Sequence, residues 1–189
     1  MAKADTSTVD LFRRAVVDHQ AGRLLRAEAG YRQILTIDHT HATAHCGLGA
    51  TLFSLGRPAE AEASCREALR LRPDYPEAHY NLSLALLALG RPAEAEASCR
   101  EALRLRPNFP EAYNNLGNVL RGLVRPAEAE ASYREALRLR PDNPKAHYNL
   151  GAMLCALGRP AEAEASCREA LRLRPDYPEA HHNRGSALA

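Results

Sequence analysis

The chain has 189 residues, of which 46% are apolar and 25% charged, and its formal net charge is +2. This near balance of charge removes the simplest electrostatic case for nucleic-acid binding. No apolar stretch is long enough to span a bilayer, and the first seven residues, MAKADTS, lack the apolar run of a signal peptide or anchor. The composition therefore predicts a soluble helical protein with neither nucleic acid nor membrane among its partners.

A period of 34 residues organises the sequence. The run RPAEAEASCREALRLRPDYPEAH at 57–79 recurs letter for letter at 159–181, and related copies begin at Arg91 and Arg125. A fixed period of this length is typical of repeat proteins, in which each unit buries its apolar face against its neighbours. Because the period is unbroken, we expect one continuous solenoid over residues 1–189 rather than two domains.

The first unit, residues 8–41, follows the period in degraded form. Ser7 is the expected start of its first helix, with Asp10 three residues later. Arg14 and Asp18 take the positions that leucines hold one period later. Charged side chains there suit an end repeat that no neighbouring repeat covers.

Each later unit contains two helical patterns separated by glycine and proline. In the unit that starts at Pro76, Gly90 permits the left-handed conformation that ends the first helix, and Pro92 opens the second. The apolar stripe of the first helix is Ala78, Leu82, Leu86 and Leu89, and that of the second is Ala95, Cys99, Ala102, Leu103 and, in part, Leu105. The regular units are 42–75, 76–109, 110–143 and 144–177, and residues 178–189 form one further first helix without a partner.

The positions of the aromatic, Leu-Gly and closing proline residues resemble the tetratricopeptide-repeat signature. The matching residues of one unit are Tyr113, Leu116, Gly117, Leu120, Ala129, Tyr133 and Pro141. The resemblance covers nearly the whole chain. It implies an all-α fold, a right-handed superhelical solenoid of antiparallel helix pairs with five repeats and one terminal helix.

Cysteine and histidine give no prediction of a metal or cofactor. The five cysteines include no C-x-x-C pair, and three of them share one repeat position with tyrosines, so we expect reduced, buried thiols and a cytoplasmic protein. His39, His41 and His45 form a loose cluster near Asp38 that could bind zinc or nickel. A structural role is the favoured interpretation, because His45 belongs to the recurrent aromatic position.

An enzyme is not expected. Catalysis needs a few different groups that converge on one reacting atom, whereas this chain repeats the same groups along an axis. The sequence contains no P-loop, no G-x-S-x-G and no zinc motif.

The resemblance implies instead a concave groove, lined by the first helices, that binds extended peptides. The residues next to the core stripe of these helices would face the partner. They are Tyr80, Asn81, Leu84, Asn114, Asn115, Asn118, Tyr148, Asn149, Ala152, His182 and Asn183.

Asparagine recurs in register at four of these positions: 81, 115, 149 and 183. An amide both donates and accepts hydrogen bonds, so such a row could pair with successive peptide groups. We expect Asn115 and Asn149 to contact the peptide backbone, and Tyr80 and Tyr148 to add apolar area. The row resembles the asparagine ladder in the tetratricopeptide arm of O-linked N-acetylglucosamine transferases, as does NNLGNVLRGL at 114–123. Asparagine could equally be common at this repeat position for reasons of packing.

The function expected from the sequence is therefore a non-enzymatic scaffold that binds an extended peptide of a partner protein in its groove. One alternative is the substrate-selecting arm of a larger enzyme, such as a glycosyltransferase. Another is a module that self-associates end to end through the helix at 178–189.

Overall fold

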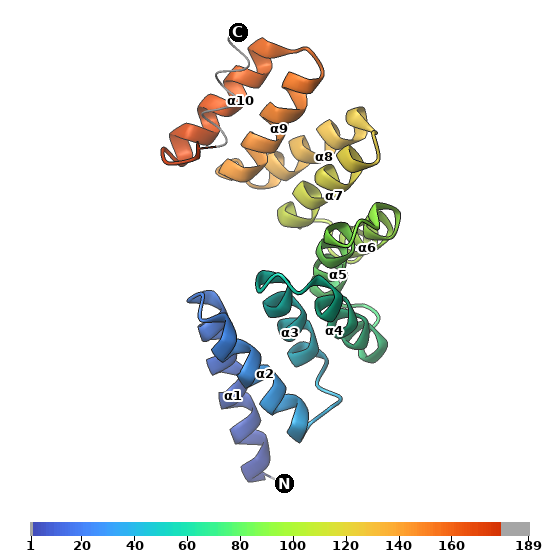
Figure 1. The fold of residues 1–189 in the computed structure, drawn as a ribbon, viewed down its shortest axis with the longest axis vertical. Helices are drawn as coiled ribbons and strands as arrows, with labels where there is room; N and C mark the ends of the chain where they lie inside the picture. The colour runs from blue at the N-terminus through green and yellow to red at the C-terminus, as the bar shows by residue number, and fades with distance from the viewer. Residues whose placement is uncertain (1, 179–189) are drawn as a thin grey trace. The chain divides into compact units, whose positions relative to one another are not determined.

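The structure, a computed structural model, describes residues 2–178, with side chains from Thr8 onward (Figure 1). All regular structure in this range is helical, and its ten helices follow one another in antiparallel pairs. None of these helices combines the length and the apolar character that crossing a bilayer requires. The chain divides into two compact units, Met1–Leu105 and Arg106–Ala189. That these units form one continuous solenoid stays a prediction.

Unit 1 contains three helix pairs and unit 2 contains two. In each pair the odd-numbered helix comes first and packs on the next; the first helices of successive pairs also touch, α1 on α3, α3 on α5, and α7 on α9. The helices of unit 1 are α1 (Ala2–Gln20), α2 (Leu24–Ile37), α3 (Ala42–Ser54), α4 (Pro58–Leu71), α5 (Pro76–Ala88) and α6 (Pro92–Leu105). Those of unit 2 are α7 (Pro110–Gly122), α8 (Pro126–Leu139), α9 (Pro144–Ala156) and α10 (Pro160–Leu173).

These five pairs correspond to the five repeats expected from the sequence, while the further helix predicted at 178–189 lies outside the described residues. Proline opens every helix from α4 to α10, where its missing N–H costs nothing. The prediction that α1 starts at Ser7 was wrong, since this helix begins at Ala2. Residues 2–7 include no proline or glycine, so no helix breaker separates them from the rest of α1.

Glycine in the left-handed conformation ends most first helices. Its φ is between 68° and 73° at Gly22, Gly56, Gly90 and Gly158. The turn between α7 and α8 differs, because Val124 takes the equivalent position with φ at 57° and an 85% exposed side chain. A β-branched residue is strained in this conformation. The α7–α8 turn therefore has an unfavourable backbone conformational energy that the turns with glycine do not have.

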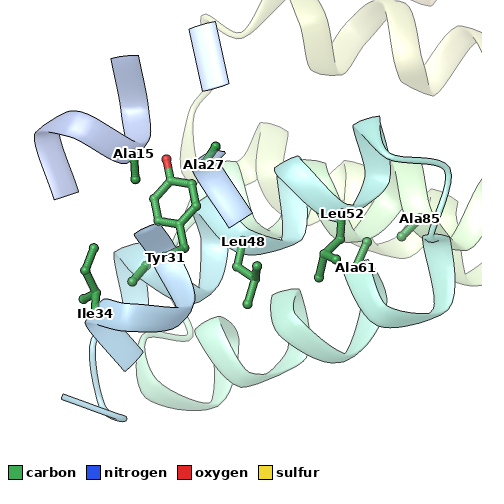
Figure 2. Packing of buried hydrophobic residues seen from close by; sticks show 9 residues of the cluster. Ala15, Ala27, Tyr31, Ile34, Leu48, Leu52, Ala61 and Ala85 are labelled. Atoms are coloured by element: carbon green, nitrogen blue, oxygen red, sulfur yellow. The ribbon is translucent and has the colours of Figure 1, made fainter. Parts of the chain in front are cut away.

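The apolar stripes pack as predicted within each unit, with differences only at their ends. On α6, Ala95, Cys99 and Ala102 are fully buried, while Leu103 and Leu105 stay half-buried. Between repeats, Tyr31 and Ile34 of α2 belong to the same core cluster as Leu48 and Leu52 of α3, as Figure 2 shows. The core of unit 1 thus continues from the first repeat into the second.

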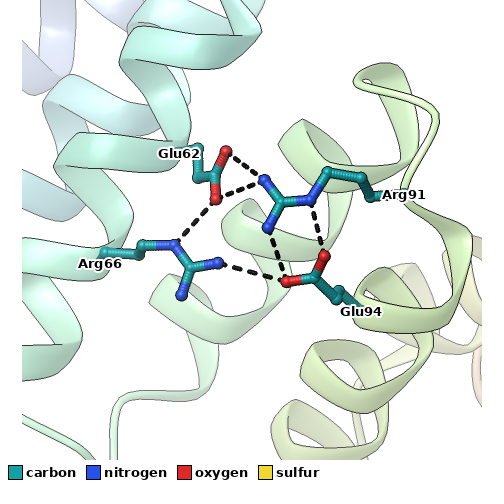
Figure 3. A network of polar contacts seen from close by, with 4 residues as sticks. All are labelled: Glu62, Arg66, Arg91 and Glu94. Atoms are coloured by element: carbon teal, nitrogen blue, oxygen red, sulfur yellow. Dashed lines mark hydrogen bonds and ion pairs between the residues drawn. The ribbon is translucent and has the colours of Figure 1, made fainter.

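A network of four charged residues joins the outer surfaces of neighbouring second helices. In Figure 3, Nη1 of Arg91 lies 2.8 Å from Oε1 of Glu62 on α4, and its Nε donates to Glu94 at 2.7 Å. Arg66 donates to Glu62 at 2.8 Å and reaches Glu94 at 3.5 Å. The same four positions pair again at Glu28, Arg32, Arg57 and Glu60, and at Glu130, Arg134, Arg159 and Glu162.

We expect this network to make the fold sensitive to acid. Burial tends to raise the pKa of Glu62, but hydrogen bonds from Arg66 and Arg91 outweigh it and lower the pKa. A carboxylate with a depressed pKa contributes stability above its ordinary pKa of about 4.3, and that stability is lost as the pH falls through the folded-state pKa. Thermal unfolding measured from pH 7 to pH 3 should therefore show a melting temperature that falls below about pH 4.3.

Glu62→Gln removes this charge while keeping the side chain's size. The variant should melt lower than the original chain at pH 7 and lose less on acidification. Glu67→Gln is the matched control, because Glu67 pairs with Arg70 on its own helix. An unchanged acid dependence in Glu62→Gln would rule out a role for the network in the pH response.

Candidate functional site

The predicted lining residues occupy three rows on the first helices. Within unit 1, α5 carries Tyr80, Asn81 and Leu84, all half-buried. Within unit 2, α7 carries Asn114, Asn115 and Asn118, and α9 carries Tyr148, Asn149 and Ala152. His182 and Asn183 lie outside the described residues. Because the two units are compact bodies of their own, each set forms a separate candidate face.

The asparagine row lies in the contact between neighbouring first helices. Nδ2 of Asn81 on α5 donates to Sγ of Cys46 on α3 at 3.4 Å. Nδ2 of Asn149 on α9 donates to Oδ1 of Asn114 on α7 at 2.9 Å. Asn115 and Asn149 are only 3% and 5% exposed, so most of each side chain serves packing between helices. The row therefore has a structural role beside any role in binding.

Tyr148, the first residue of the trio on α9, packs on another residue of its own repeat. The rings of Tyr148 and Tyr177 have centroids 5.1 Å apart. The equivalent pair in unit 1 is Cys46 and Tyr75, where burial is the main reason that the pKa of the Cys46 thiol rises to about 11. Sequence reasoning missed Cys46 and Tyr177 as partners of the candidate residues. A search for contacts one residue beyond the 34-residue period would have found Asn81 and Cys46, which are 35 residues apart. Tyr148 and Tyr177 are 29 residues apart within one repeat.

Two tyrosines at one repeat position pack against different first helices, and one of them, Tyr31, interrupts the asparagine row. Tyr133 lies against Gly117 of its own pair, and its Oη donates to Oδ1 of Asn118 at 2.9 Å. Tyr31 instead reaches the next first helix, where a Cβ on Gly47 would lie 2.5 Å from its Cζ. Position 47 is equivalent to Asn81, so the Tyr31 ring excludes asparagine there. The break in the row follows from core packing.

One amide pair in unit 2 has hydrogen-bonding capacity left over. Asn114 accepts the bond from Asn149, and in the described part of the chain no other hydrogen bond reaches either side chain. Nδ2 of Asn114 thus keeps its donors and Oδ1 of Asn149 keeps its acceptor sites. Both residues are more than nine-tenths buried, at 7% and 5% exposure. Leaving such groups unmet costs about 1–3 kcal/mol each.

The histidines near the α2–α3 junction have structural partners. His41 stacks on Phe12 with centroids 5.6 Å apart, and its Nδ1 accepts a hydrogen bond from the backbone N–H of Ala44, which caps α3. Nε2 of His45 bonds the backbone oxygen of His39 at 3.0 Å. Among the described residues, no three histidine, cysteine, aspartate or glutamate side chains are grouped so as to hold a metal ion.

Antiparallel helix pairs that recur every 34 residues and stack on one another within each unit define a helical repeat protein. The family model described as tetratricopeptide repeat matches residues 12–76, 46–110 and 114–178. The chain therefore belongs to the tetratricopeptide-repeat family. No curated protein matches the sequence significantly.

Several solved structures share this fold. TTC0263, a thermophilic TPR protein of Thermus thermophilus, is 25% identical with a TM-score of 0.82, and the match covers 96% of this chain and 98% of that one. YrrB, described as a TPR protein with an unusual peptide-binding site, is 25% identical with a TM-score of 0.70, over 93% and 90%. PilF of Pseudomonas aeruginosa is 21% identical with a TM-score of 0.83, over 98% and 89%.

Proposed function

We propose that this protein is a non-enzymatic scaffold that binds an extended peptide segment of a partner protein across its first helices. Membership in the tetratricopeptide-repeat family supports the general role of protein binding. The likeness to YrrB, whose description names a peptide-binding site, supports a peptide as the ligand.

The observation that carries the proposal is the amide pair of Asn114 and Asn149. An extended peptide laid across α7 and α9 would offer a carbonyl oxygen to Nδ2 of Asn114 and an N–H to Oδ1 of Asn149. Both contacts involve the peptide backbone, so they would accept many sequences. Binding would also satisfy two buried polar groups that have no other partner among the described residues.

The surrounding residues would supply the remaining contacts. Tyr148 and Asn118 are half-buried beside the amide pair and offer apolar area and a further amide. In unit 1, the half-buried Tyr80, Asn81 and Leu84 form the equivalent face on α5. We assign the backbone contacts to Asn114 and Asn149, because these two amides are bonded to each other, and the contact expected of Asn115 stays a prediction. His182 and Asn183 stay predictions.

The test begins with selection of a binding peptide from a displayed library of random 12-residue sequences. Affinities are then measured by calorimetry for the original chain and for the double variant Asn114→Ala/Asn149→Ala. The loss of two hydrogen bonds, each with a net value of about 1 kcal/mol, should weaken binding roughly tenfold or more. Asn108→Ala is the matched control, because Asn108 is exposed in the turn before α7.

A double variant that melts like the original chain and binds the peptide equally well would remove the amide pair from the proposal. If no library peptide binds either unit, the peptide-binding function itself is wrong.

The finer alternatives from the sequence stay proposals. The asparagine row and the segment 114–123 are the features that support a substrate-selecting arm of a larger enzyme, similar to that of O-linked N-acetylglucosamine transferases. The five free cysteines support a reducing, cytoplasmic setting. Self-association through the helix predicted at 178–189 concerns residues outside the described range.

A further inference from the structure

The first helix pair presents an apolar position that is covered in every other repeat. Val17 on α1 is 51% exposed. The equivalent residues Thr51, Ala85, Val119 and Met153 are at most 5% exposed. Thr51 shows what covers this position, because its Oγ1 lies 2.9 Å from Nδ1 of His19 on the preceding first helix. By analogy with Thr51, the position of Val17 is suited to contact with another helix.

Arg26 lines two cavities, one between α1 and α2 and one that also includes Leu55 after α3. One, of about 440 Å³, lies between α1 and α2 and is lined by Leu11, Arg14, Ala15, Arg26, Ala29 and Gly30, among others. The other, of about 500 Å³, is lined by Leu24, Leu25, Arg26 and Leu55 as well as the turn. The side chain of Leu25 on α2 is 72% exposed, and the equivalent residue of the other second helices is alanine. We call the surface formed by Val17, Arg14, Arg26 and the cavity between α1 and α2 the N-terminal face.

The next repeat shows which element fits such a surface. Leu48 and Leu52 on α3, which are equivalent to Arg14 and Asp18, share one core cluster with Tyr31 and Ile34 of the preceding second helix, α2. The predicted solvent exposure holds for Arg14, whereas Asp18 is only 9% exposed and accepts a hydrogen bond from Arg23 at 2.6 Å. By analogy, the occupant of the N-terminal face is a helix.

The charged side chains of the N-terminal face indicate which kind of helix it binds. In each described network, the arginine of the preceding second helix faces a glutamate, as Arg66 faces Glu94. Arg26 stands at the position equivalent to Glu94, so a second helix of this same chain would bring arginine against arginine. Neither Arg14 nor Arg26 has an ion-pair partner in the described part of the chain. The face therefore disfavours a second copy and favours acidic side chains.

We propose that the N-terminal face binds an acidic amphipathic helix of a partner protein. The apolar side of this helix packs on Val17 and fills the cavity between α1 and α2. Its acidic residues pair with Arg14 and Arg26. This surface is separate from the α7 and α9 face that binds the extended peptide, so the two proposals stand or fall independently.

The test uses two synthetic peptides built on α4, the second helix that makes the network in Figure 3. Both have the sequence of residues 58–71 with Cys65→Ala, and one also carries Arg66→Glu. The two are titrated into the full chain and binding is followed by amide chemical shifts. We expect the Arg66→Glu peptide to shift resonances of α1 and α2 and to bind about tenfold tighter than the peptide that keeps Arg66.

A charge-reversal variant of the protein, titrated with the same two peptides, provides the most specific test. Arg26→Glu should invert the order, because it restores the acidic residue found at this position in the other repeats. Arg121→Glu, which reverses an exposed arginine of α7, should leave the order unchanged. Equal binding of both peptides, shifts outside α1 and α2, or no binding at millimolar concentration would overturn the proposal. Tighter binding of the Arg66 peptide to the original chain would overturn it in favour of a second copy.

Discussion

Gly117→Ala is expected to destabilise unit 2 by about 3 kcal/mol, because overpacking a well-filled core costs this much. An added Cβ would lie 2.6 Å from Cδ1 of Tyr133. The ring cannot move aside easily, since Tyr133 is fully buried and its Oη is bonded to Asn118. Urea unfolding followed by circular dichroism measures the loss directly.

A double-mutant cycle identifies the clash as the cause. Tyr133→Cys should cost about 3 kcal/mol by itself, because it opens a cavity. With cysteine at position 133, adding Gly117→Ala should cost less than it does beside the ring, so the two losses should fall short of additivity by about 1 kcal/mol. The repeat before it supports this expectation, since Ser83 and Cys99 occupy the equivalent positions and both are fully buried.

Gly122→Ala is the control for the cycle, because a Cβ on Gly122 would meet nothing within 4 Å. It should be neutral or slightly stabilising. Additive losses for Gly117→Ala and Tyr133→Cys would mean that the two residues do not compete for the same space.

Val124→Gly is expected to stabilise unit 2 by about 1 kcal/mol. The left-handed conformation costs a residue with a Cβ about 1–2 kcal/mol, and glycine avoids this while losing more backbone entropy on folding. Four equivalent turns already have glycine at this position, with φ between 68° and 73°. Thermal unfolding of the variant should show a raised melting temperature.

Val124→Ala separates backbone strain from the cost of exposing an apolar side chain. Alanine keeps a Cβ in the left-handed conformation and removes most of the exposed apolar surface, so it should recover only a small part of the gain. If Val124→Ala stabilises as much as Val124→Gly, strain is not the reason for the effect.

The repeat fold could be predicted from the sequence because its signals are local. Proline opens the helices and glycine ends them, so Pro92 and Gly90 fix their boundaries to within a residue or two. The 34-residue period then gives the pairing, since a helix pair with one apolar stripe must bury it on a neighbour. The start of α1 was misjudged because a capping pattern at Ser7 is a weaker signal than an unbroken run of residues without proline or glycine.

The candidate site was less predictable, because it depends on contacts between repeats. Helical periodicity placed Asn149 next to the core stripe, but it could not show that Asn114 lies 2.9 Å away on the preceding first helix. Likewise, the sequence places Tyr31 and Tyr133 at one repeat position. The ring of Tyr133 nevertheless lies against a glycine of its own helix pair, whereas the ring of Tyr31 lies against a glycine of the next pair. Side-chain direction at such positions is decided by the space that neighbouring repeats leave.

The central claim is that Asn114 and Asn149 bind the backbone of an extended peptide. The most direct measurement is the nuclear magnetic resonance signal of the Asn114 Nδ2 protons during titration with a selected peptide. We predict that these protons shift and exchange more slowly with solvent as the peptide binds, because they donate to its carbonyl oxygen. Unchanged Asn114 side-chain signals at saturation, with shifts elsewhere on the protein, would contradict the account.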